Sequence, residues 1–484
     1  MSHEHGHSSH HGPSMKRLKQ VLLVLCAAQL MVILDITAVN VALPDMAGGL
    51  GIHGSDIGWA VTSYSLIFGS LLLLGGRAAD LIGRRRMFLA GLAAFTTASV
   101  CASVSGSAGA LFAARAAQGL GAAMLSPAAL SILMSTFREG RPRAHALAAW
   151  GAVGGAGAAV GVLVGGTLTQ LVGWQAIFLI NVPVGIALAI ACRRIIPADA
   201  AAPRWSGLDV RGAALATSSL GAFVFALSQA DTAGWSSVQT FAVGGAGLAG
   251  LLAFAVLELR TAQPLLRIRR LADRGVGGGF SMMFPASAAL FGSFLLVSVY
   301  MQDVLKAGPM ETGLAFLPFA FAIAGGVHVG SHVMHHAGVR VPMAAGFAVG
   351  AAGMLLLSGA GEHGGYLADV LPGMLVAGIG LGIVLVCVSV SVMTGADEEE
   401  SGMLSGLNTT GHEIGGSIGI AVVTTLAAGS GAIGVPSVLT HGIGQAFLAL
   451  AGIAGVASLA ALILIPPAAT FLPKLRLAPR VAMH

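Results

Sequence analysis

Long apolar runs separated by short polar stretches follow one another along almost the whole chain. Each run reaches the length of about 20 residues that an α-helix needs to cross the hydrocarbon core of a bilayer. The runs are too long and too uniform for the alternating strands of a membrane β-barrel. We therefore predict an all-α polytopic membrane protein. Fourteen spans are expected, at about residues 19–45, 56–76, 86–105, 108–136, 144–171, 174–194, 210–229, 238–259, 277–302, 311–333, 341–359, 367–394, 403–429 and 443–465.

The basic residues orient these spans. If the N-terminus is cytoplasmic, all but two of the 25 Lys and Arg residues fall in cytoplasmic connections or tails. The exceptions are Arg115, which lies inside a span, and Lys306. Because Lys and Arg accumulate on the cytoplasmic side of membrane proteins, we predict fourteen transmembrane helices with both termini cytoplasmic. The expected location is a bacterial-type cytoplasmic (inner) membrane.

Composition narrows the class further. The 484 residues are 56% hydrophobic and 9% charged, whereas about 25% of residues are charged in average soluble domains. The 70 glycines suit helices that pack closely in lipid. All four cysteines lie inside apolar spans, so no disulfide is expected. The chain has no phosphate-binding loop, so ATP is not expected as the energy source.

One carboxylate, Asp35, interrupts the first apolar run near its middle. A charge at that depth costs a few kcal/mol (about 2.5–3.5 by insertion scales), and Leu or Ala would pack equally well. We predict that Asp35 faces a polar cavity and takes up and releases a proton. Its natural partner is Arg115 in the fourth span, and a movement separating the two would change the proton affinity of Asp35. The alternative is a permanent ion pair that only stabilises the fold.

The connection between the second and third spans reads GGRAADLIGRRRM, residues 75–87. It resembles the signature loop of the major facilitator superfamily, G-x-x-x-D-x-x-G-R-[RK], through Gly76, Asp80, Gly83, Arg84 and Arg85. The resemblance implies a loop that acts as a conformational latch between two halves of the molecule. Charge that merely orients the chain would explain the arginines but not the Gly and Asp spacing.

Further stretches resemble the fourteen-helix drug:proton antiporter branch of that superfamily. Arg115 begins an R-x-x-Q-G-x-G element, and residues 34–46 match the branch around Asp35. Residues 174–185 resemble its W-R-x-x-F-x-[IL]-N-x-P-[IV]-G element, with Gln175 in place of the usual Arg. The resemblance implies a multidrug efflux type of transporter.

The fifth span carries a stripe of glycines. Gly161, Gly165 and Gly166 match the antiporter motif G-P-x-x-G-G, and Gly157 extends the stripe by one turn. Val162 stands where proline is usual in that motif. A bare stripe permits close, sliding contact with a facing helix, and generic small-residue packing is the alternative.

The resemblance implies five parts. Residues 1–18 are a disordered His-rich cytoplasmic tail, 19–197 an N-terminal six-helix bundle, 198–262 two inserted helices, 263–470 a C-terminal six-helix bundle, and 471–484 a cytoplasmic tail. The inserted helices carry no recognisable site.

The second half departs from the family pattern. Glu413 in the thirteenth span is a second deep acid, expected either to bind a second proton or a cationic substrate, or to cap charges near the cytoplasmic end. His328, His332 and His335 share one helix face and have the spacing for Zn or Cu binding or pH sensing. A degenerate latch with weakly cationic side chains is the favoured interpretation, so no metal site is predicted.

These features predict a proton-coupled antiporter that exports amphipathic drugs or antibiotic-like small molecules across the cytoplasmic membrane by alternating access. Its expected partners are a small amphipathic substrate, protons and the lipid bilayer, with no nucleic acid. We expect a monomer with no cofactor and no enzymatic activity. A narrow-specificity metabolite exporter or symporter of the same fold is the alternative. A non-transporting membrane receptor is less favoured, because no connection is long enough for a soluble domain.

Overall fold

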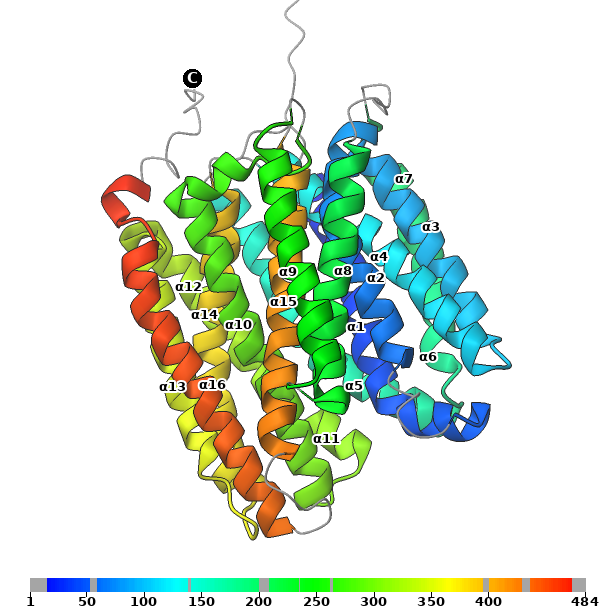
Figure 1. Ribbon diagram of the computed structural model, residues 1–484, viewed down its shortest axis with the longest axis vertical. Coiled ribbons are helices and arrows are strands. Elements are labelled where there is room, and N and C mark those ends of the chain that lie inside the picture. Colours follow the sequence, from blue (N-terminus) through cyan, green and yellow to red (C-terminus); the bar gives the residue numbers. More distant parts are fainter. Residues whose placement is uncertain are drawn as a thin grey trace, which may run out of the picture.

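The structure, a computed structural model, describes residues 15–52, 59–137, 141–199, 209–234, 236–261, 264–394, 400–428 and 436–471. Within these residues all regular secondary structure is helical (Figure 1). Eleven helices of this described part are long and apolar enough to cross a membrane, which confirms the all-α polytopic class. Of the predicted tails, 1–18 and 471–484, residues 1–14 and 472–484 lie outside the described residues, whereas residues 15–18 form the start of the first helix.

The first helical group comprises α1 (Met15–Leu50), α2 (Trp59–Ile82), α3 (Arg84–Ser103), α4 (Ala108–Thr136), α5 (Arg141–Leu171), α6 (Ala176–Leu179) and α7 (Asn181–Ile195). A tight turn at residues 104–107 joins α3 to α4. Ser107 caps α4 there by accepting a hydrogen bond from the Ala110 N–H at 3.3 Å.

The inserted pair consists of α8 (Val210–Ala233) and α9 (Val238–Glu258). The second helical group comprises η3 (Ile268–Ala272), α10 (Arg274–Val299), η4 (Tyr300–Val304), α11 (Pro309–Ala315), α12 (Leu317–Ala337), α13 (Arg340–Ser358), η5 (Tyr366–Val370), α14 (Leu371–Met393), α15 (Ser401–Ala428) and α16 (Pro436–Leu464). Asp209, Ser237 and Asp273 cap α8, α9 and α10 through side-chain oxygens. Every predicted span therefore overlaps a helical segment.

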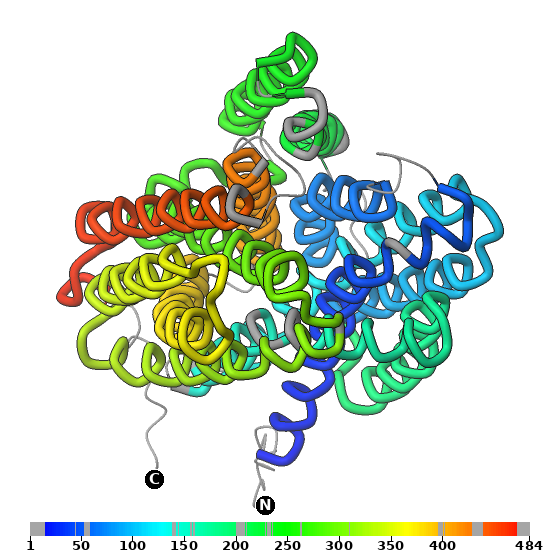
Figure 2. Tube along the Cα trace, turned by 90° about the horizontal axis from the view of Figure 1, so that it is seen from below, coloured from blue at the N-terminus to red at the C-terminus, as the bar shows by residue number. Residues whose placement is uncertain are grey.

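The two helical groups repeat one packing scheme. In the first group α1 packs on α5, α2 and α3 pack on α4, and α3 packs on α7. In the second group α10 packs on α15, α12 and α13 pack on α14, and α13 packs on α16. The largest contacts between the groups are those of α2 with α15 and of α5 with α12, and α4 also packs on α15 while α11 and α14 pack on α5. The inserted pair lies outside both groups, beside α2 and α15 (Figure 2).

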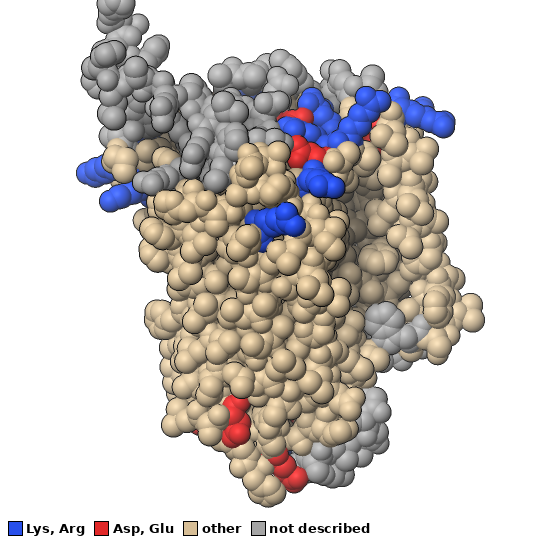
Figure 3. All heavy atoms as spheres, turned by 90° about the vertical axis from the view of Figure 1, so that its left-hand side faces the viewer, with Lys and Arg blue, Asp and Glu red and all other residues tan. Residues whose placement is uncertain are grey.

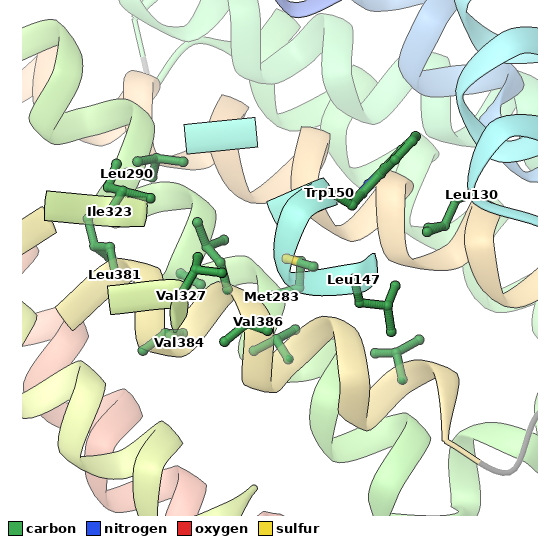
Figure 4. Packing of buried hydrophobic residues seen from close by; sticks show 14 of the residues in the cluster. Leu130, Leu147, Trp150, Met283, Leu290, Ile323, Val327, Leu381, Val384 and Val386 are labelled. Atoms are coloured by element: carbon green, nitrogen blue, oxygen red, sulfur yellow. The ribbon is translucent and has the colours of Figure 1, made fainter. Parts of the chain in front are cut away.

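One hydrophobic core extends through both helical groups. Leu147 and Trp150 of α5 belong to the same cluster of buried side chains as Met283, Val327 and Val386 of the second group (Figure 4). Close-packed apolar side chains therefore form a large part of the contact between the groups.

Charged side chains are confined to the two ends of the molecule on the face seen in Figure 3, with a broad band free of them between. Lys and Arg gather at one end, which we call the basic end. The helices α2, α4, α7, α9 and α12 end there, and α3, α5, α8, α10, α13 and α15 begin there. Large apolar side chains such as Phe321 (75% exposed) and Phe241 (69%) lie on the outside of the helices. That surface suits contact with lipid tails.

Candidate functional site

Asp35 on α1 and Arg115 on α4 form an ion pair inside the first helical group. Each residue is 1% exposed, and Nη1 of Arg115 lies 2.5 Å from Oδ2 of Asp35. The amides of Gln118 and Asn181 donate to Oδ1 of Asp35 at 3.0 and 2.9 Å. Gln118 also donates to Ser99 at 2.8 Å. Both carboxylate oxygens therefore have donors, as a buried charge requires.

Arg115 is held by α2 as well as by α1. Its Nε donates to the Ala60 carbonyl at 2.9 Å, and its Cζ lies 4.4 Å from the centroid of the Tyr64 ring. Such a cation–π contact attracts the guanidinium to α2. The Tyr64 hydroxyl is buried and has no hydrogen-bond partner within the described residues. A displacement of α2 relative to α1 must therefore change the contacts of Arg115.

A cavity of about 710 Å³ lies between the two helical groups. Ile33, Ile36 and Thr37 of α1 line it. Asp35 is not among its lining residues, because it lies on the opposite face of the helix. Asp35 therefore does not face this cavity. The predicted pairing of Asp35 with Arg115 is present.

Glu413 does line the cavity, from the middle of α15. It lies twelve residues after Ser401, or about 18 Å along the helix, which removes the alternative that it caps charges at the helix end. No donor within the described residues hydrogen-bonds its carboxylate. The neighbouring His412 has Nδ1 2.6 Å from the Ser287 hydroxyl and its ring 5.2 Å from that of Phe291.

The rest of the cavity wall is largely apolar and aromatic, with a few polar groups. Its aromatic residues include Trp59, Phe68, Trp150, Phe291, Phe294 and Phe319, and its polar residues include Gln29, Asn40, Ser389, Asn408 and Thr409. A cavity of this size and lining suits a small amphipathic molecule.

Asp80 joins the two helical groups at the basic end. Its carboxylate accepts hydrogen bonds from the N–H groups of Gly402 at 3.0 Å and Met403 at 3.1 Å, in the first turn of α15. This turn carries the positive end of the helix dipole, which stabilises an anion. Arg84 Nη2 lies 3.7 Å from the same carboxylate. A Cβ at Gly76 would overlap the Gly402 carbonyl, so glycine is needed for this close approach.

Gly83 and Arg85 have their contacts, within the described residues, in the first helical group. Gly83 has φ +117° and separates α2 from α3. The Asp199 carboxylate accepts from the N–H groups of Arg85 and Arg86 at 3.1 and 3.0 Å, and Arg85 Nη2 donates to the Arg193 carbonyl at 2.8 Å. Asp199 could not be recognised from the sequence, because it lies more than 100 residues from its partners.

A second ion-pair group lies near Asp80. Glu400 accepts from Arg267 Nη1 and Arg270 Nη2, both at 2.6 Å. Burial by itself would raise the pKa of Glu400, but the hydrogen bonds from Arg270 and Arg267 outweigh it and hold the pKa below its ordinary value of 4.5. These contacts attach the connection between α9 and α10 to the start of α15.

The glycine stripe of α5 faces α1, the helix that carries Asp35. A Cβ at Gly157 would lie 3.0 Å from Ile33 Cγ2, and one at Gly165 would lie 2.6 Å from Ala38 Cα. A Cβ at Gly161 would overlap the Thr37 hydroxyl, and Gly166 is buried. The predicted close contact with a facing helix is therefore present.

The histidines of α12 do not converge. His332 contacts His336, with ring centroids 6.0 Å apart, and His335 faces His145 of α5 across the two groups at 6.3 Å. His328 is exposed. Within the described residues, no group of three or more His, Cys, Asp or Glu side chains is placed to hold a metal.

A helical membrane protein with two repeated helical groups around a central cavity is the architecture of a transporter. The sequence profile of the Major Facilitator Superfamily matches residues 25–420, and the chain belongs to this family. The predicted resemblance is thereby confirmed, and with it a transporter rather than an enzyme.

Several relatives are exporters or resistance proteins by name. The chain is 37% identical over 434 residues to the cephamycin export protein CmcT of Amycolatopsis lactamdurans, covering 89% of each chain. It is 36% identical to the puromycin resistance protein pur8 of Streptomyces alboniger, covering 84% of this chain and 82% of that one. It is 32% identical to the multidrug resistance protein Stp of Mycobacterium tuberculosis, covering 84% and 76%.

A solved structure has the same fold. The human organic anion transporter MFSD10 (TETRAN) superposes with a TM-score of 0.64 at 16% sequence identity, covering 92% of this chain and 99% of that one.

Proposed function

We propose that this protein exports amphipathic small molecules across the cytoplasmic membrane in exchange for protons, by alternating access. The observation that carries the proposal is the position of Arg115, which is shared between Asp35 on α1 and the Ala60 carbonyl and Tyr64 ring on α2. A helix movement can therefore change the charge environment of a buried carboxylate, which is what coupling to protons requires.

The proposed coupling runs through α2. When α2 moves relative to α1, Arg115 leaves Asp35, and the desolvated carboxylate takes up a proton. When α2 returns, the guanidinium favours the ionised form and the proton leaves. One proton moving through a potential of about 100 mV supplies about 2.3 kcal/mol, enough for modest concentrative export.

Asp80 is proposed as the latch that ties this movement to the opening of the basic end. It lies on α2 and caps α15 of the other helical group. Gly76 allows the two helices to touch, Arg84 pairs with Asp80, and Gly83 with Arg85 fixes the turn into α3. Opening the basic end must break the Asp80 contacts and thereby release α2.

The conformation is proposed to be open toward the outside. The basic end is taken as cytoplasmic by the charge rule, and the contacts of Asp80 with Gly402 and Met403 close it. The lining residues of α1 run from the middle of that helix toward its C-terminal end, from Gln29 to Leu43, and those of α2 fall in its first half, from Trp59 to Phe68. The cavity therefore extends from mid-membrane toward the opposite end.

The membrane topology is proposed to have fourteen spans. Beyond the eleven apolar helices, α5, α8 and α15 are 31, 24 and 28 residues long, enough to cross. All three contribute residues to the cavity wall, and small and polar residues there lower their hydropathy. Both helical groups and the cavity belong to one chain, so a monomer suffices.

Substrates are proposed to bind in the cavity with a cationic or polar group near Glu413. An unpaired carboxylate in an apolar cavity favours either a proton or a cationic ligand, so Glu413 can exchange one for the other. The names of the relatives suggest cephamycins, puromycin and mixed drugs as compounds to test. Puromycin carries an amino group and an aromatic nucleoside, which fits this cavity.

A narrow-specificity exporter of the same fold is the second candidate, favoured by the 37% identity to a protein named for one compound class. Competition experiments separate the two. A broad exporter is inhibited by many unrelated amphipathic compounds, and a narrow one by close analogues only.

The test uses purified protein in inverted vesicles with an imposed pH gradient. Tetraphenylphosphonium, ethidium, puromycin or a cephalosporin is added, and the lumenal pH is followed. Substrate-dependent dissipation of the gradient is expected, lost in Asp35→Asn and kept in Asp303→Asn, a matched change at an exposed acid. Normal proton exchange by Asp35→Asn would sink the proposal.

A further inference from the structure

The inserted pair lies beside the contact between α2 of the first helical group and α15 of the second, which we call the seam. The two helices of the pair differ in position. α8 packs against α2 of the first group and α15 of the second, whereas α9 packs against α8 (Figure 2). Only 11% of the most apolar 18-residue stretch of α9 is buried. Phe241 and Leu252 of this helix are 69% and 64% exposed. α9 therefore faces lipid, and α8 faces the protein.

α8 fills the seam with one apolar stripe. Leu220 and Val224, 1% and 4% exposed, form a buried cluster with Ile414 of α15. Leu66 of α2 and Phe284 of α10 pack against the same cluster. Ile414 directly follows Glu413 in the sequence, so α8 closes the seam at the level of the cavity acid.

The same stripe continues into the cavity. Val224, Leu227 and Gln229 line the cavity wall. Leu220, Val224 and Leu227 are spaced four and three residues apart, so they share one helix face. Sequence analysis found no site in this region, because an apolar stripe in an apolar helix resembles any other lipid-facing or packing surface.

We propose that α8 is the lipid-side wall of the substrate cavity, and that Val224 and Leu227 limit the shape of the apolar part of the substrate. The substrate class is an amphipathic cation with a bulky apolar group, which packs on α8 while its charge lies near Glu413. Without α8, the seam between α2 and α15 would open Glu413 to hydrocarbon, where a charged side chain costs about 2.5–3.5 kcal/mol. The role in selecting substrates rests on the proposed export function, whereas the wall itself does not.

The wall is tested first without any substrate. In a variant whose four cysteines are replaced by serine, Leu227→Cys and Leu252→Cys are compared for reaction with a charged methanethiosulfonate. The reaction needs water and a thiolate, so Leu227→Cys is expected to react about tenfold faster or more. Equal rates at the two positions, or no reaction at Leu227→Cys, would overturn the proposal.

Selection is tested by changing the size of the wall. Leu227→Trp is expected to weaken the transport of bulky tetraphenylphosphonium about tenfold while changing that of the smaller tetraethylammonium much less, as pocket shape discriminates in other proteins. Leu227→Ala is expected to reverse the preference. Leu252→Trp and Leu252→Ala are the matched controls on α9 and leave both compounds unchanged. Parallel changes for both compounds, or equal effects at Leu252, would contradict selection by α8.

The two tests separate this inference from the proposed function. If the wild-type protein transports no compound, export fails, and the thiol reaction still decides whether α8 lines the cavity. In that case binding of the same two cations is measured by quenching of the fluorescence of Trp59 and Trp150, which line the cavity. Unchanged relative affinity in Leu227→Trp would then refute selection by α8.

Discussion

Asp35 and Glu413 are both carboxylates deep inside helices, and the structure gives them opposite surroundings. Asp35 is enclosed by Arg115, Gln118 and Asn181 within one helical group. Glu413 lines the cavity between the groups, and no donor within the described residues binds its carboxylate. Asp35 is thus an enclosed carboxylate with its hydrogen-bond donors in place, whereas the Glu413 carboxylate is accessible to a ligand in the cavity.

This contrast suggests that the two carboxylates have different roles. A carboxylate with all its donors changes its proton affinity only when a helix moves, so Asp35 is suited to sense conformation. A carboxylate in a cavity exchanges partners without any helix movement, so Glu413 is suited to sense occupancy. The proposed coupling then needs a structural link between them, and α2 is placed to be this link, since Tyr64 contacts Arg115 while Phe68, one turn further, lines the cavity.

The largest expected effect is that of Arg115→Gln. Removing the guanidinium leaves Asp35 buried and unpaired, and breaking such a pair typically costs about 3–5 kcal/mol. We expect a strongly lowered melting temperature in detergent and no proton exchange. The double variant Asp35→Asn with Arg115→Gln should regain most of the stability but no proton exchange. Proton-coupled export by Arg115→Gln would show that the enclosed pair is only structural.

Glu413→Gln tests the proposed role of the cavity carboxylate in cation binding. The change keeps the size of the side chain and removes the charge that we assign to cation binding. We expect affinity for tetraphenylphosphonium to fall about tenfold to a hundredfold, corresponding to about 1.4–2.7 kcal/mol, with little change in melting temperature. A neutral antibiotic of similar size serves as the control ligand, measured by the same fluorescence quenching. Equal losses for the charged and neutral compounds would contradict a charge contact at Glu413.

Tyr64 is the place to test the link between the two acids. Tyr64→Leu removes the ring under Arg115, a contact worth about 2 kcal/mol when desolvated, and should weaken coupling while binding in the cavity persists. Tyr64→Phe keeps the ring and removes only a hydroxyl without a partner. It should stay close to wild type in stability. The measurement is the number of protons moved per substrate as a function of pH, and identical values for Tyr64→Leu and wild type would break the proposed link.

The helices and the Asp35–Arg115 pair could be predicted from the sequence, for simple reasons. A segment that crosses a bilayer must satisfy its backbone hydrogen bonds internally, so apolar runs of bilayer length are expected to form helices. Two opposite charges inside such runs are expected to form an ion pair, because an unpaired charge in the bilayer is costly. The latch and the glycine stripe came from the family resemblance, and the structure gave each a definite partner, Asp80 to the first turn of α15 and Gly161 to Thr37.

What could not be predicted depends on helix rotation and long-range contacts. The side of α1 that carries Asp35 is fixed by where α4 and α7 pack, and nothing local in the sequence encodes it. Asp199 and Glu400 are acids near polar connections whose partners lie more than 100 residues away. The part of α8 in the cavity wall was missed, because its residues carry no distinctive chemistry.

Asp80→Asn is expected to affect proton exchange at Asp35 without affecting cation binding at Glu413. The change removes a charge from the N-terminus of α15, an interaction worth about 0.3–2 kcal/mol, so the basic end should open more often. Spin labels at Arg86→Cys and His336→Cys, in the two helical groups, would report a larger population of long distances. Because α2 carries both Asp80 and the contacts of Arg115, proton exchange should change while affinity for the cation at Glu413 stays within about twofold of wild type. An unchanged distance distribution would remove the latch from the mechanism.

The smallest expected effect concerns the pH dependence of Glu400. The pKa of Glu400 in the folded protein is held below 4.5 by Arg270 and Arg267, so its contribution to stability is full above about pH 4.5 and is lost as the pH falls through the lowered value. Arg267 is 47% exposed and Arg270 28%, so solvent screening limits the contribution to about 1 kcal/mol or less. The gap in melting temperature between wild type and Glu400→Gln should therefore be present at pH 6–8, narrow below pH 4.5, and shrink in high salt. Since Glu400 does not titrate between pH 5 and 8, the pH profile of transport in that range should be the same in Glu400→Gln and wild type. A shifted profile in Glu400→Gln would mean that the latch region, and not the contrast between Asp35 and Glu413, sets the proton dependence of export.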